Sequence, residues 1–328
     1  MRIKLLALIA TICSTFAAYG ADNWKHDIFV AQDGSGDYTT ITEALEGVRA
    51  YMDYTVTIHI APGVYKEKVV IPSWLKNVVF EGSGAENTII TWNDHANINK
   101  MGTFRTYTVR VDGDNLTFRN LTIENNAPRL GQAVALHTEG DCLKFENCRL
   151  LGDQDTLFTG GEHTRLYFNN CYIEGTTDFI FGPATAYFKD CTIHSKVNSY
   201  ITAASTPKDV AVGYVFDSCR LTAAPEANSV YLGRPWRPYA HTVFIDCEMG
   251  GHIRSEGWHN WNNADNEQTA RYGEYGSKGP GGNMTGRVAW AKTLDEATAA
   301  ELRSLCKIFS LQSKWCPSGC CKTECCKK

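Results

Sequence analysis

Past its first twenty residues, the sequence has no hydrophobic run long enough to cross a bilayer, which excludes a membrane-spanning chain. It also has no excess of basic residues, since 32 lysines and arginines stand against 36 aspartates and glutamates. A nucleic-acid-binding protein needs a basic stripe, so we expect no nucleic-acid partner. Low-complexity tracts are missing too. With 43% hydrophobic and 21% charged residues, the composition excludes a disordered or collagen-like chain.

The amino terminus has the pattern of an export signal. Arg2 and Lys4 precede an apolar stretch, and the small residues Ala18 and Gly20 flank a plausible cleavage point. We therefore interpret residues 1–20 as a signal peptide and expect a secreted, extracellular protein, or a periplasmic one in a Gram-negative cell. Cleavage would remove two of the 32 basic residues and none of the 36 acidic ones, which leaves a mildly acidic protein.

One short pattern recurs along the chain: a phenylalanine, two residues, a cysteine, one residue and a large apolar side chain. Its copies begin at Phe145, Phe168, Phe188, Phe216 and Phe244, and an earlier copy at Phe118 has Leu121 in place of cysteine. Spacings of 20 to 28 residues between copies indicate a solenoid in which each repeat forms one coil. The residue before each cysteine is Asn, Asp or Ser, which favours a bend between two strands.

Thirteen cysteines in an exported chain would ordinarily suggest disulfides. Stacked coils would instead align the repeat cysteines in one column at about the 4.8 Å spacing of neighbouring strands. We interpret these as buried free thiols: Cys148, Cys171, Cys191, Cys219 and Cys247. Helical patterns occur only at Thr40–Met52 and Leu294–Phe309, and would cap the solenoid ends. The sequence therefore predicts an all-β fold, a right-handed parallel β-helix with short capping helices.

Two acidic motifs lie one coil apart. Asp155 and Asp178 are separated by 23 residues, so we expect them side by side on adjacent coils. Neighbouring carboxylates have separated pKa values, so that one is ionised as a nucleophile or base while the other keeps its proton as an acid. Spacing alone leaves open the alternative of two solvated turn aspartates.

Further motifs follow one another along the chain. In order they are Gly36-Asp-Tyr-Thr-Thr-Ile41, Pro62-Gly-Val-Tyr65-Lys-Glu67, Gln132-Ala-Val-Ala-Leu136, Gly152-Asp-Gln-Asp-Thr-Leu157, Asp178-Phe-Ile-Phe-Gly182, Leu232-Gly-Arg-Pro-Trp236, Gly257-Trp258 with Trp261, Glu274-Tyr275 and Gly279-Pro-Gly281. This series resembles the pectin methylesterase (pectinesterase) family. The resemblance implies a right-handed parallel β-helix, in agreement with the repeats, and a domain over residues 21–306. It also implies a monomeric enzyme that removes methyl esters from methylesterified homogalacturonan (pectin), releasing methanol without a cofactor.

The resemblance implies a role for each of five polar residues. Asp178 would be the nucleophile, and Asp155 would be the general acid and then the base. Gln132 and Gln154 would donate hydrogen bonds to the oxyanion, although a single glutamine in a β-helix often belongs to an amide ladder or a turn. Arg234 would keep Asp178 ionised through a charge-assisted hydrogen bond and would contact substrate. We expect the charge of Asp178 to raise the pKa of Asp155.

Aromatic residues in the motifs divide into two groups. Trp236 and Phe181 would contact the sugar, with ordinary packing as the alternative for Phe181. Structural roles are expected for Tyr65, Glu67, Trp258 and Trp261. No metal site is expected, because the residues lack the clustering of a zinc site and the pattern of a calcium loop.

The chain departs from the common family pattern at two places. Asp153 adds a carboxylate beside Gln154 and Asp155. Two orientations remain open for its side chain: toward solvent, or into the cleft, where it would raise the pKa of Asp155 further and disfavour nearby galacturonate carboxylates. Residues 307–328, preceded by Cys306, form a Cys/Lys-rich tail. Disulfide stapling, attachment to a partner, and metal binding or no defined role remain open for this tail.

Three other functions remain as alternatives. A different esterase or thioesterase on the same scaffold would keep both aspartates. A pectate lyase or galacturonase also uses a β-helix, but with calcium carboxylates and a basic catalyst, or with a different acidic cluster. A non-enzymatic, cell-wall-binding β-helix would not need this set of polar residues.

Overall fold

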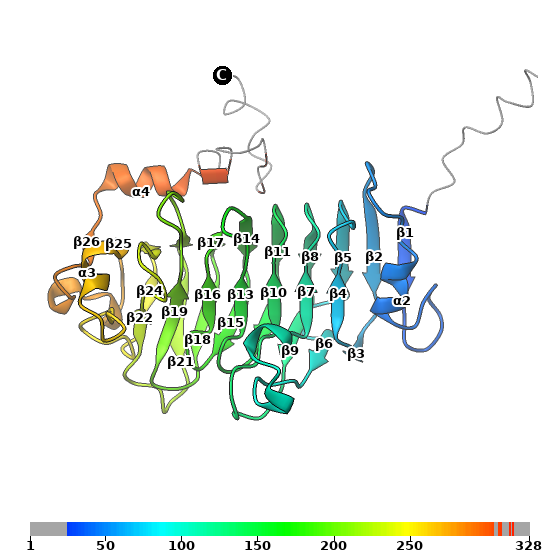
Figure 1. The fold of residues 1–328 in the computed structure, drawn as a ribbon, viewed down its shortest axis with the longest axis horizontal. Coiled ribbons are helices and arrows are strands. Elements are labelled where there is room, and N and C mark those ends of the chain that lie inside the picture. Colours follow the sequence, from blue (N-terminus) through cyan, green and yellow to red (C-terminus); the bar gives the residue numbers. More distant parts are fainter. Residues whose placement is uncertain (1–24, 305–307, 310–314, 316, 318–328) are drawn as a thin grey trace, which may run out of the picture.

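A computed structural model describes residues 25–304, 308, 309, 315 and 317. Its strands pair only in parallel and form three long sheets that wind around one elongated core, as Figure 1 shows. This is the expected right-handed parallel β-helix. The predicted signal peptide and nearly all of the Cys/Lys-rich tail lie outside the described residues. None of the helices in the described part is long and apolar enough to cross a membrane.

Each of the seven complete coils contributes one strand to each sheet, and the turns at the two ends contribute to sheet A alone or to sheets A and B. Sheet A has eleven strands: β1 (Asp27–Val30), β2 (Val56–Ile60), β5 (Val78–Gly82), β8 (Thr117–Arg119), β11 (Leu143–Glu146), β14 (Arg165–Asn169), β17 (Thr185–Lys189), β20 (Tyr214–Asp217), β23 (His241–Ile245), β25 (Arg271–Tyr275) and β26 (Lys292–Thr293). Sheet B has eight: β3 (Gly63–Lys66), β6 (Thr88–Trp92), β9 (Thr122–Asn125), β12 (Arg149–Leu151), β15 (Tyr172–Gly175), β18 (Thr192–Ser195), β21 (Arg220–Ala223) and β24 (Glu248–Met249). Sheet C has seven: β4 (Val69–Ile71), β7 (Val109–Val111), β10 (Leu136–Thr138), β13 (Leu157–Thr159), β16 (Ile180–Gly182), β19 (Tyr200–Ala204) and β22 (Tyr231–Gly233).

The repeated phenylalanines form a stack in the core behind sheet A. Neighbouring ring centroids are 4.4 to 4.9 Å apart with nearly parallel planes, in the order Phe80, Phe118, Phe145, Phe168, Phe188, Phe216 and Phe244. Offset stacking of this kind adds to the free energy gained by burying the rings. The same residue type at the same strand position therefore holds the coils in register.

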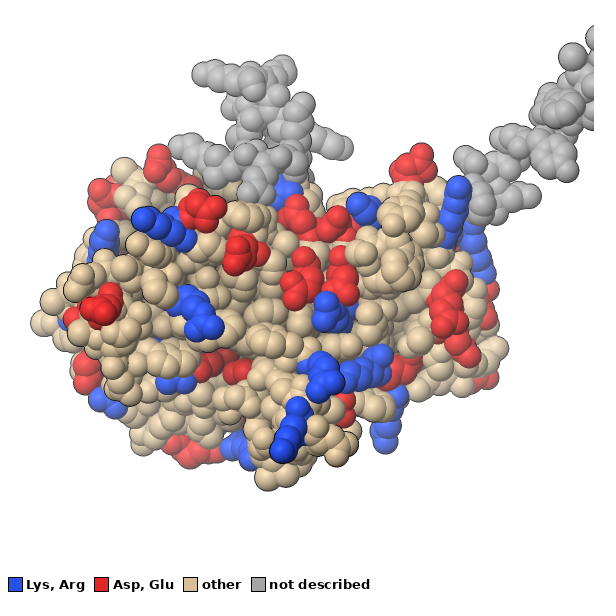
Figure 2. Space-filling model, viewed as in Figure 1, with Lys and Arg blue, Asp and Glu red and all other residues tan. Residues whose placement is uncertain are grey.

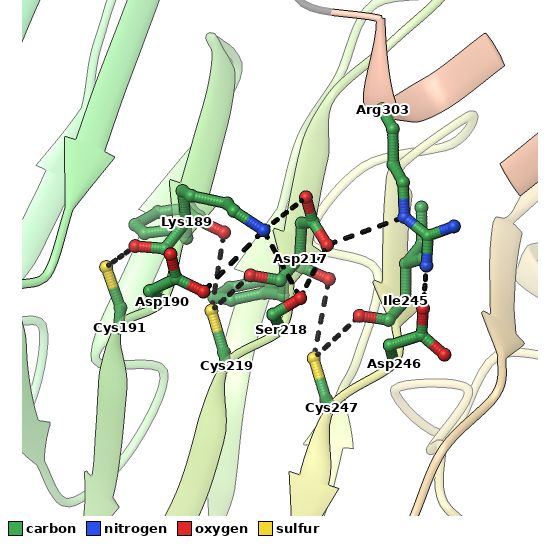
Figure 3. A network of polar contacts seen from close by, with 12 residues as sticks. Lys189, Asp190, Cys191, Asp217, Ser218, Cys219, Ile245, Asp246, Cys247 and Arg303 are labelled. Carbon is green, nitrogen blue, oxygen red and sulfur yellow. Dashed lines mark hydrogen bonds and ion pairs between the residues drawn. The ribbon is translucent and has the colours of Figure 1, made fainter. Parts of the chain in front are cut away.

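The repeat cysteines are buried and free, as predicted. Each thiol donates to backbone carbonyls, and Cys219, for example, contacts the oxygens of Asp217 and Phe188, the latter on the preceding coil. Figure 3 shows three of these thiols in a column. Burial raises the pKa of the Cys219 and Cys247 thiols well above the usual value. They therefore act as small hydrophobic groups with weak donors.

The residue before each cysteine makes the predicted bend. Asn147, Asn170, Asp190, Ser218 and Asp246 all have φ between 51° and 56°, in the left-handed region that Asn and Asp tolerate. The Asn170 amide donates to the side chain of Asn147 on the preceding coil at 2.8 Å. These bends repeat at the same position of each coil and join sheet A to sheet B.

The amino-terminal helix is shorter than predicted. Helix α2 covers only Ile41–Glu46, with Thr40 as its N-cap. Its C-cap is Gly47, where the Tyr38 side chain leaves no room for a Cβ, and the predicted continuation to Met52 is not helical. Ile41, Ala44 and Leu45 are buried in the main core. Figure 1 shows α2 at one end of the solenoid, where it serves as the expected cap.

The prediction for the carboxy-terminal helix was wrong in position. Helix α4 (Glu296–Arg303) does not close the end of the solenoid but lies against the outer face of sheet A. Its Ala299 packs there with Val215 and Val243, and Arg303 pairs with the carboxylates of Asp217 and Asp246 (Figure 3). Helix α4 packs at this position because β20 and β23 have apolar residues on their outward faces.

The remaining short helices are irregular connections. They are η1 (Ile98–Lys100), η2 (Thr103–Arg105), α3 (Asp265–Thr269), η3 (Pro280–Gly282) and η4 (Met284–Gly286). The loop with η1 and η2 lies between β6 and β7 and carries Phe104 beside sheet C. On the face drawn in Figure 2, acidic and basic side chains of the described residues are interspersed.

Candidate active site

A cavity of about 260 Å³ opens on the outer face of sheet C. It is lined by Thr103, Phe104, Gln132, Gln154, Asp155, Asp178, Phe181, Ala203, Arg234, Trp236 and Trp261. All seven candidate site residues from the sequence therefore meet in one place. They come from successive coils because each motif precedes, follows or belongs to a strand of sheet C.

The two aspartates occupy equivalent turns on adjacent coils, as their spacing predicted. Leu157 pairs with Ile180 in the ladder between β13 and β16, which places Asp155 directly beside Asp178. Both residues have positive φ, 66° and 49°. Their backbone N–H groups still donate to the next coil, Asp155 to Thr177 and Asp178 to Tyr200. The ladder therefore fixes both turns and directs two carboxylates into the cavity.

Arg234 binds the Asp178 carboxylate with two hydrogen bonds. Its Nε donates to Oδ1 at 3.0 Å and its Nη2 to Oδ2 at 2.6 Å. Burial raises the pKa of Asp178, while the hydrogen bonds and charge of Arg234 oppose that effect. A bidentate pair of this kind orients the carboxylate as well as stabilising its charge.

Among the described residues, Asp155 has no cation bound to its carboxyl group in this way, and its pKa is raised well above the usual range. Burial is the largest cause, the charge of Asp178 is the second, and the more distant Arg234 acts in the opposite direction. The sequence-based expectation named only the neighbouring charge, and so missed the main cause. The pKa of Asp155 is therefore raised more strongly than that of Asp178, so that Asp178 is the first of the two to ionise.

Gln132 and Gln154 lie at the cavity wall on neighbouring coils. The N–H of Ala133 donates to the Gln154 carbonyl at 3.0 Å, so the two side chains enter the cavity from adjacent turns. Within the described residues neither side-chain amide makes a hydrogen bond to protein, so neither is engaged in an amide ladder there. Both are placed to donate to a ligand beside the aspartates.

Aromatic side chains also line the cavity. Phe181 and Trp236 contact each other with centroids 5.9 Å apart, and both face the cavity. Trp261, which we expected to be structural, also lines the cavity, whereas Trp258 is buried in the core as expected. Phe104 was not predicted as a site residue. It lies on a loop outside the repeats, and nothing in the sequence pattern indicates that this loop reaches the cavity.

The other structural assignments agree with the contacts. Tyr65 is buried and donates to the Ala61 carbonyl, and the Glu67 carboxylate accepts from the first N–H groups of α2. Asp153 does not line the cavity: its carboxylate pairs with Arg129 and Lys196, each at 2.9 Å. It is also not among the groups that shift the pKa of Asp155.

Among the described residues, no group of three or more His, Cys, Asp or Glu side chains could hold a metal.

Comparisons with known proteins agree with this arrangement. The Pectinesterase family model matches residues 27–307. Pectinesterase 31 of Arabidopsis thaliana is 40% identical over 281 residues, which cover 82% of this chain and 88% of that protein. A longer relative, the probable pectinesterase/pectinesterase inhibitor 21 of the same plant, is 37% identical, and the match spans 44% of its length.

Solved structures show the same likeness. Carrot pectin methylesterase is 34% identical with a TM-score of 0.80, over 86% of this chain and 92% of that one. A pectin methylesterase solved in complex with a hexasaccharide is 26% identical with a TM-score of 0.77, over 88% of this chain and 98% of that one. The family match, the shared β-helix and the coverage lead to one conclusion: this chain belongs to the pectinesterase family.

Proposed function

We propose that this pectinesterase is a secreted hydrolase that removes methyl esters from the galacturonate units of pectin, with Asp178 as nucleophile and Asp155 as general acid and base. The observation that carries the proposal is the pair of adjacent carboxylates, of which only Asp178 has a bidentate arginine partner. Methylesterified homogalacturonan is the substrate, and the sugar rings pack on Trp236 and Phe181. Export depends on residues 1–20, and the enzyme acts as a monomer.

In the first half-reaction, an Asp178 oxygen attacks the ester carbonyl carbon. The tetrahedral intermediate places its negative charge on the former carbonyl oxygen, which accepts hydrogen bonds from Gln132 and Gln154. Collapse breaks the bond to the methoxy oxygen, and Asp155 gives its proton to that oxygen, so methanol leaves. The galacturonate acyl group is then joined to Asp178 as an anhydride.

In the second half-reaction, Asp155 is ionised and takes a proton from water. The resulting hydroxide attacks the acyl carbon, and the same two amides stabilise the second oxyanion. Collapse releases the free galacturonate unit and restores the Asp178 carboxylate, which again accepts two hydrogen bonds from Arg234. Asp155 ends protonated, ready for the next ester, so the cycle balances without a cofactor.

The direct test is methanol release from highly methylated pectin by the exported protein. We expect release by the wild type and none by Asp178→Asn. Absence of methanol from well-folded wild type would contradict the proposal. Amino-terminal sequencing of the exported protein tests the cleavage after the signal peptide, and its molar mass in solution tests the monomer.

The same samples separate the alternatives. Hydrolysis of thioesters or other esters, without activity on pectin, would favour a different esterase on this scaffold. New reducing ends would indicate a galacturonase, and unsaturated products a lyase. Retention on methylated pectin without any product would indicate a wall-binding solenoid.

A further inference from the structure

The Arg234 guanidinium is enclosed by two aromatic rings. Its central carbon lies 3.9 Å from the ring centroid of Tyr200 and 3.7 Å from that of Trp261. Two rings cannot both approach so closely on one face of the guanidinium, so they cover opposite faces. Both free faces of the cation are thus occupied, and its edge remains for Asp178.

The Tyr200 ring is itself held from behind. It stacks on Tyr231 of the next coil at 5.3 Å, with 12° between the planes. The edge of His259 contacts both rings, at 5.4 and 5.2 Å, and Arg254 lies over the Tyr231 ring at 4.7 Å. Tyr200 therefore has little freedom to move away from Arg234.

Tyr200 also holds the other member of the ion pair. Its backbone carbonyl accepts the N–H of Asp178 at 2.9 Å, in the turn where Asp178 has positive φ. One residue thus contacts the backbone of Asp178 through its carbonyl and the guanidinium of Arg234 through its ring. We infer that Tyr200 is a positioning residue for the reaction, whose ring keeps Arg234 in the plane that gives Asp178 two hydrogen bonds. This inference rests on the proposed function only for the role of Asp178.

Loss of the ring has a defined consequence. An arginine with one uncovered face can rotate and take up water, and the bidentate geometry with Asp178 weakens. Arg234 then opposes the effect of burial less strongly, so the pKa of Asp178 rises. A misplacement of about 1 Å near a reacting group lowers kcat by up to about a hundredfold. The ring does not line the cavity, so KM changes little.

Three single variants test the ring. Tyr200→Leu should lower kcat about ten- to a hundredfold at unchanged KM, and should move the acid limb of the pH profile to higher pH. Tyr200→Phe keeps the ring and should restore both properties. Tyr172→Leu is the matched control, since Tyr172 lies on sheet B with Arg149 over its ring at 5.4 Å, away from the cavity, and it should leave activity unchanged. A folded Tyr200→Leu enzyme with normal kcat and pH profile would overturn the inference, as would equal loss in Tyr200→Phe.

A double-variant cycle shows whether Tyr200 acts through Arg234. In an Arg234→Lys background the compact ammonium cannot stack in the same way, so adding Tyr200→Leu should have an effect of less than about twofold. An unchanged ten- to hundredfold effect in that background would show that the ring acts by another route.

A measurement without turnover separates this inference from the proposed function. In protein labelled with ¹³C-aspartate, the Asp178 carboxyl signal, identified by its loss in Asp178→Asn, should titrate at higher pH in Tyr200→Leu than in wild type or Tyr200→Phe. Among the described residues, Asp155, His259, Arg254 and Tyr272 are the other charged or titratable groups around Asp178 and Arg234. Wild type and both Tyr200 variants share them. A shifted titration in a protein without methanol release would leave the positioning role intact and refute the function. Methanol release with an unshifted titration would refute only the positioning role.

Discussion

The surroundings of the two neighbouring carboxyl groups, Asp155 and Asp178, differ by one cation, Arg234. Burial raises the pKa of both Asp155 and Asp178, but only Asp178 has the bidentate contact with Arg234. This asymmetry supports the proposed order of the two roles, with Asp178 as nucleophile and Asp155 as acid.

Substitution of each aspartate should therefore have a different effect. Asp178→Ala removes the covalent route and should reduce methanol release to background. Asp155→Ala removes only proton transfer, which is worth about 10²–10⁴-fold. Because this variant also lacks the base for deacylation, mass spectrometry with methylated oligogalacturonide should find an increment on the Asp178 peptide. An increment on Asp155 in the reciprocal variant, or substantial activity of Asp178→Ala, would reverse or refute the assignment.

The pH profile should be bell-shaped. The rate rises with pH as Asp178 loses its proton and becomes a nucleophile. It falls again as pH passes through the raised pKa of Asp155, because the acid that protonates methanol is lost. The residual activity of Asp155→Asn, measured as kcat/KM against pH, should keep the acid limb and lose the alkaline limb. Retention of the alkaline limb in that variant would assign it to another group.

At the residue scale, the sequence was sufficient to place residues in the candidate site when they belong to the repeat. Asp155 and Asp178 could be placed side by side because 23 residues make one coil. Phe104 could not be placed, since its loop lies outside the repeat. Trp261 was assigned to packing because a tryptophan next to Trp258 gives no sign of its direction. Asp153 was left open, and only the positions of Arg129 and Lys196 show that its charge is used outside the cavity.

Among the elements, α4 is a helix whose existence can be predicted from the sequence but whose packing position cannot. Its pattern is present at Leu294–Phe309, yet its position depends on outward-facing apolar residues of β20 and β23, which belong to two different coils. The buried carboxylate of Asp217 receives hydrogen bonds from Tyr187 and Lys189 and pairs with Arg303. Burial acts to raise the pKa of Asp217, but these hydrogen bonds outweigh it and hold the pKa below the usual value.

Asp217→Asn should therefore destabilise the protein in a pH-dependent way. At pH 7 it should lower the free energy of unfolding by about 1.5–3 kcal/mol, the range for hydrogen bonds to a charged group. The pKa of Asp217 is lower in the folded state, so its contribution is complete above the unfolded value of about 3.9 and is lost as pH falls through the folded value. Urea unfolding should show that the difference in the free energy of unfolding between wild type and variant becomes smaller at acid pH.

Asp190→Asn is the matched control for this prediction. Asp190 pairs with the same Lys189, but its side chain is 55% exposed, so the change should cost no more than about 1 kcal/mol. If the difference in the free energy of unfolding between wild type and Asp217→Asn stayed constant from pH 7 into acid, the lowered pKa of Asp217 would not contribute to stability.

At the scale of the whole molecule, the solenoid consists of columns of like residues. The repeat predicted the cysteine column and the stacked coils, because equivalent residues of neighbouring coils lie next to each other. We expect Cys148, Cys171, Cys191, Cys219 and Cys247 to be protected from thiol reagents in the native protein and to react after denaturation. Mass mapping of the labelled peptides checks this. Disulfides among these five residues would contradict the column of free thiols.

The phenylalanine stack predicts that stability depends on position along the solenoid. Phe168 stacks on Phe145 and Phe188, whereas Phe80 stacks on Phe118 alone, with Ile58 on its other side. Both rings are fully buried, so replacement of either by alanine should cost about 3–5 kcal/mol. Phe168→Ala should cost about 0.5–1.5 kcal/mol more, because it breaks two ring contacts instead of one.

Urea unfolding of the two variants measures this difference in the free energy of unfolding. The coils contact only their neighbours, so a defect at Phe168 separates two parts of the stack, whereas a defect at Phe80 shortens it from one end. Phe168 also lies on the coil between Asp155 and Asp178, so methanol release should fall further in Phe168→Ala than in Phe80→Ala. Equal losses of stability and activity at the two positions would mean that the stacked rings contribute burial alone and do not hold the active-site coils in register.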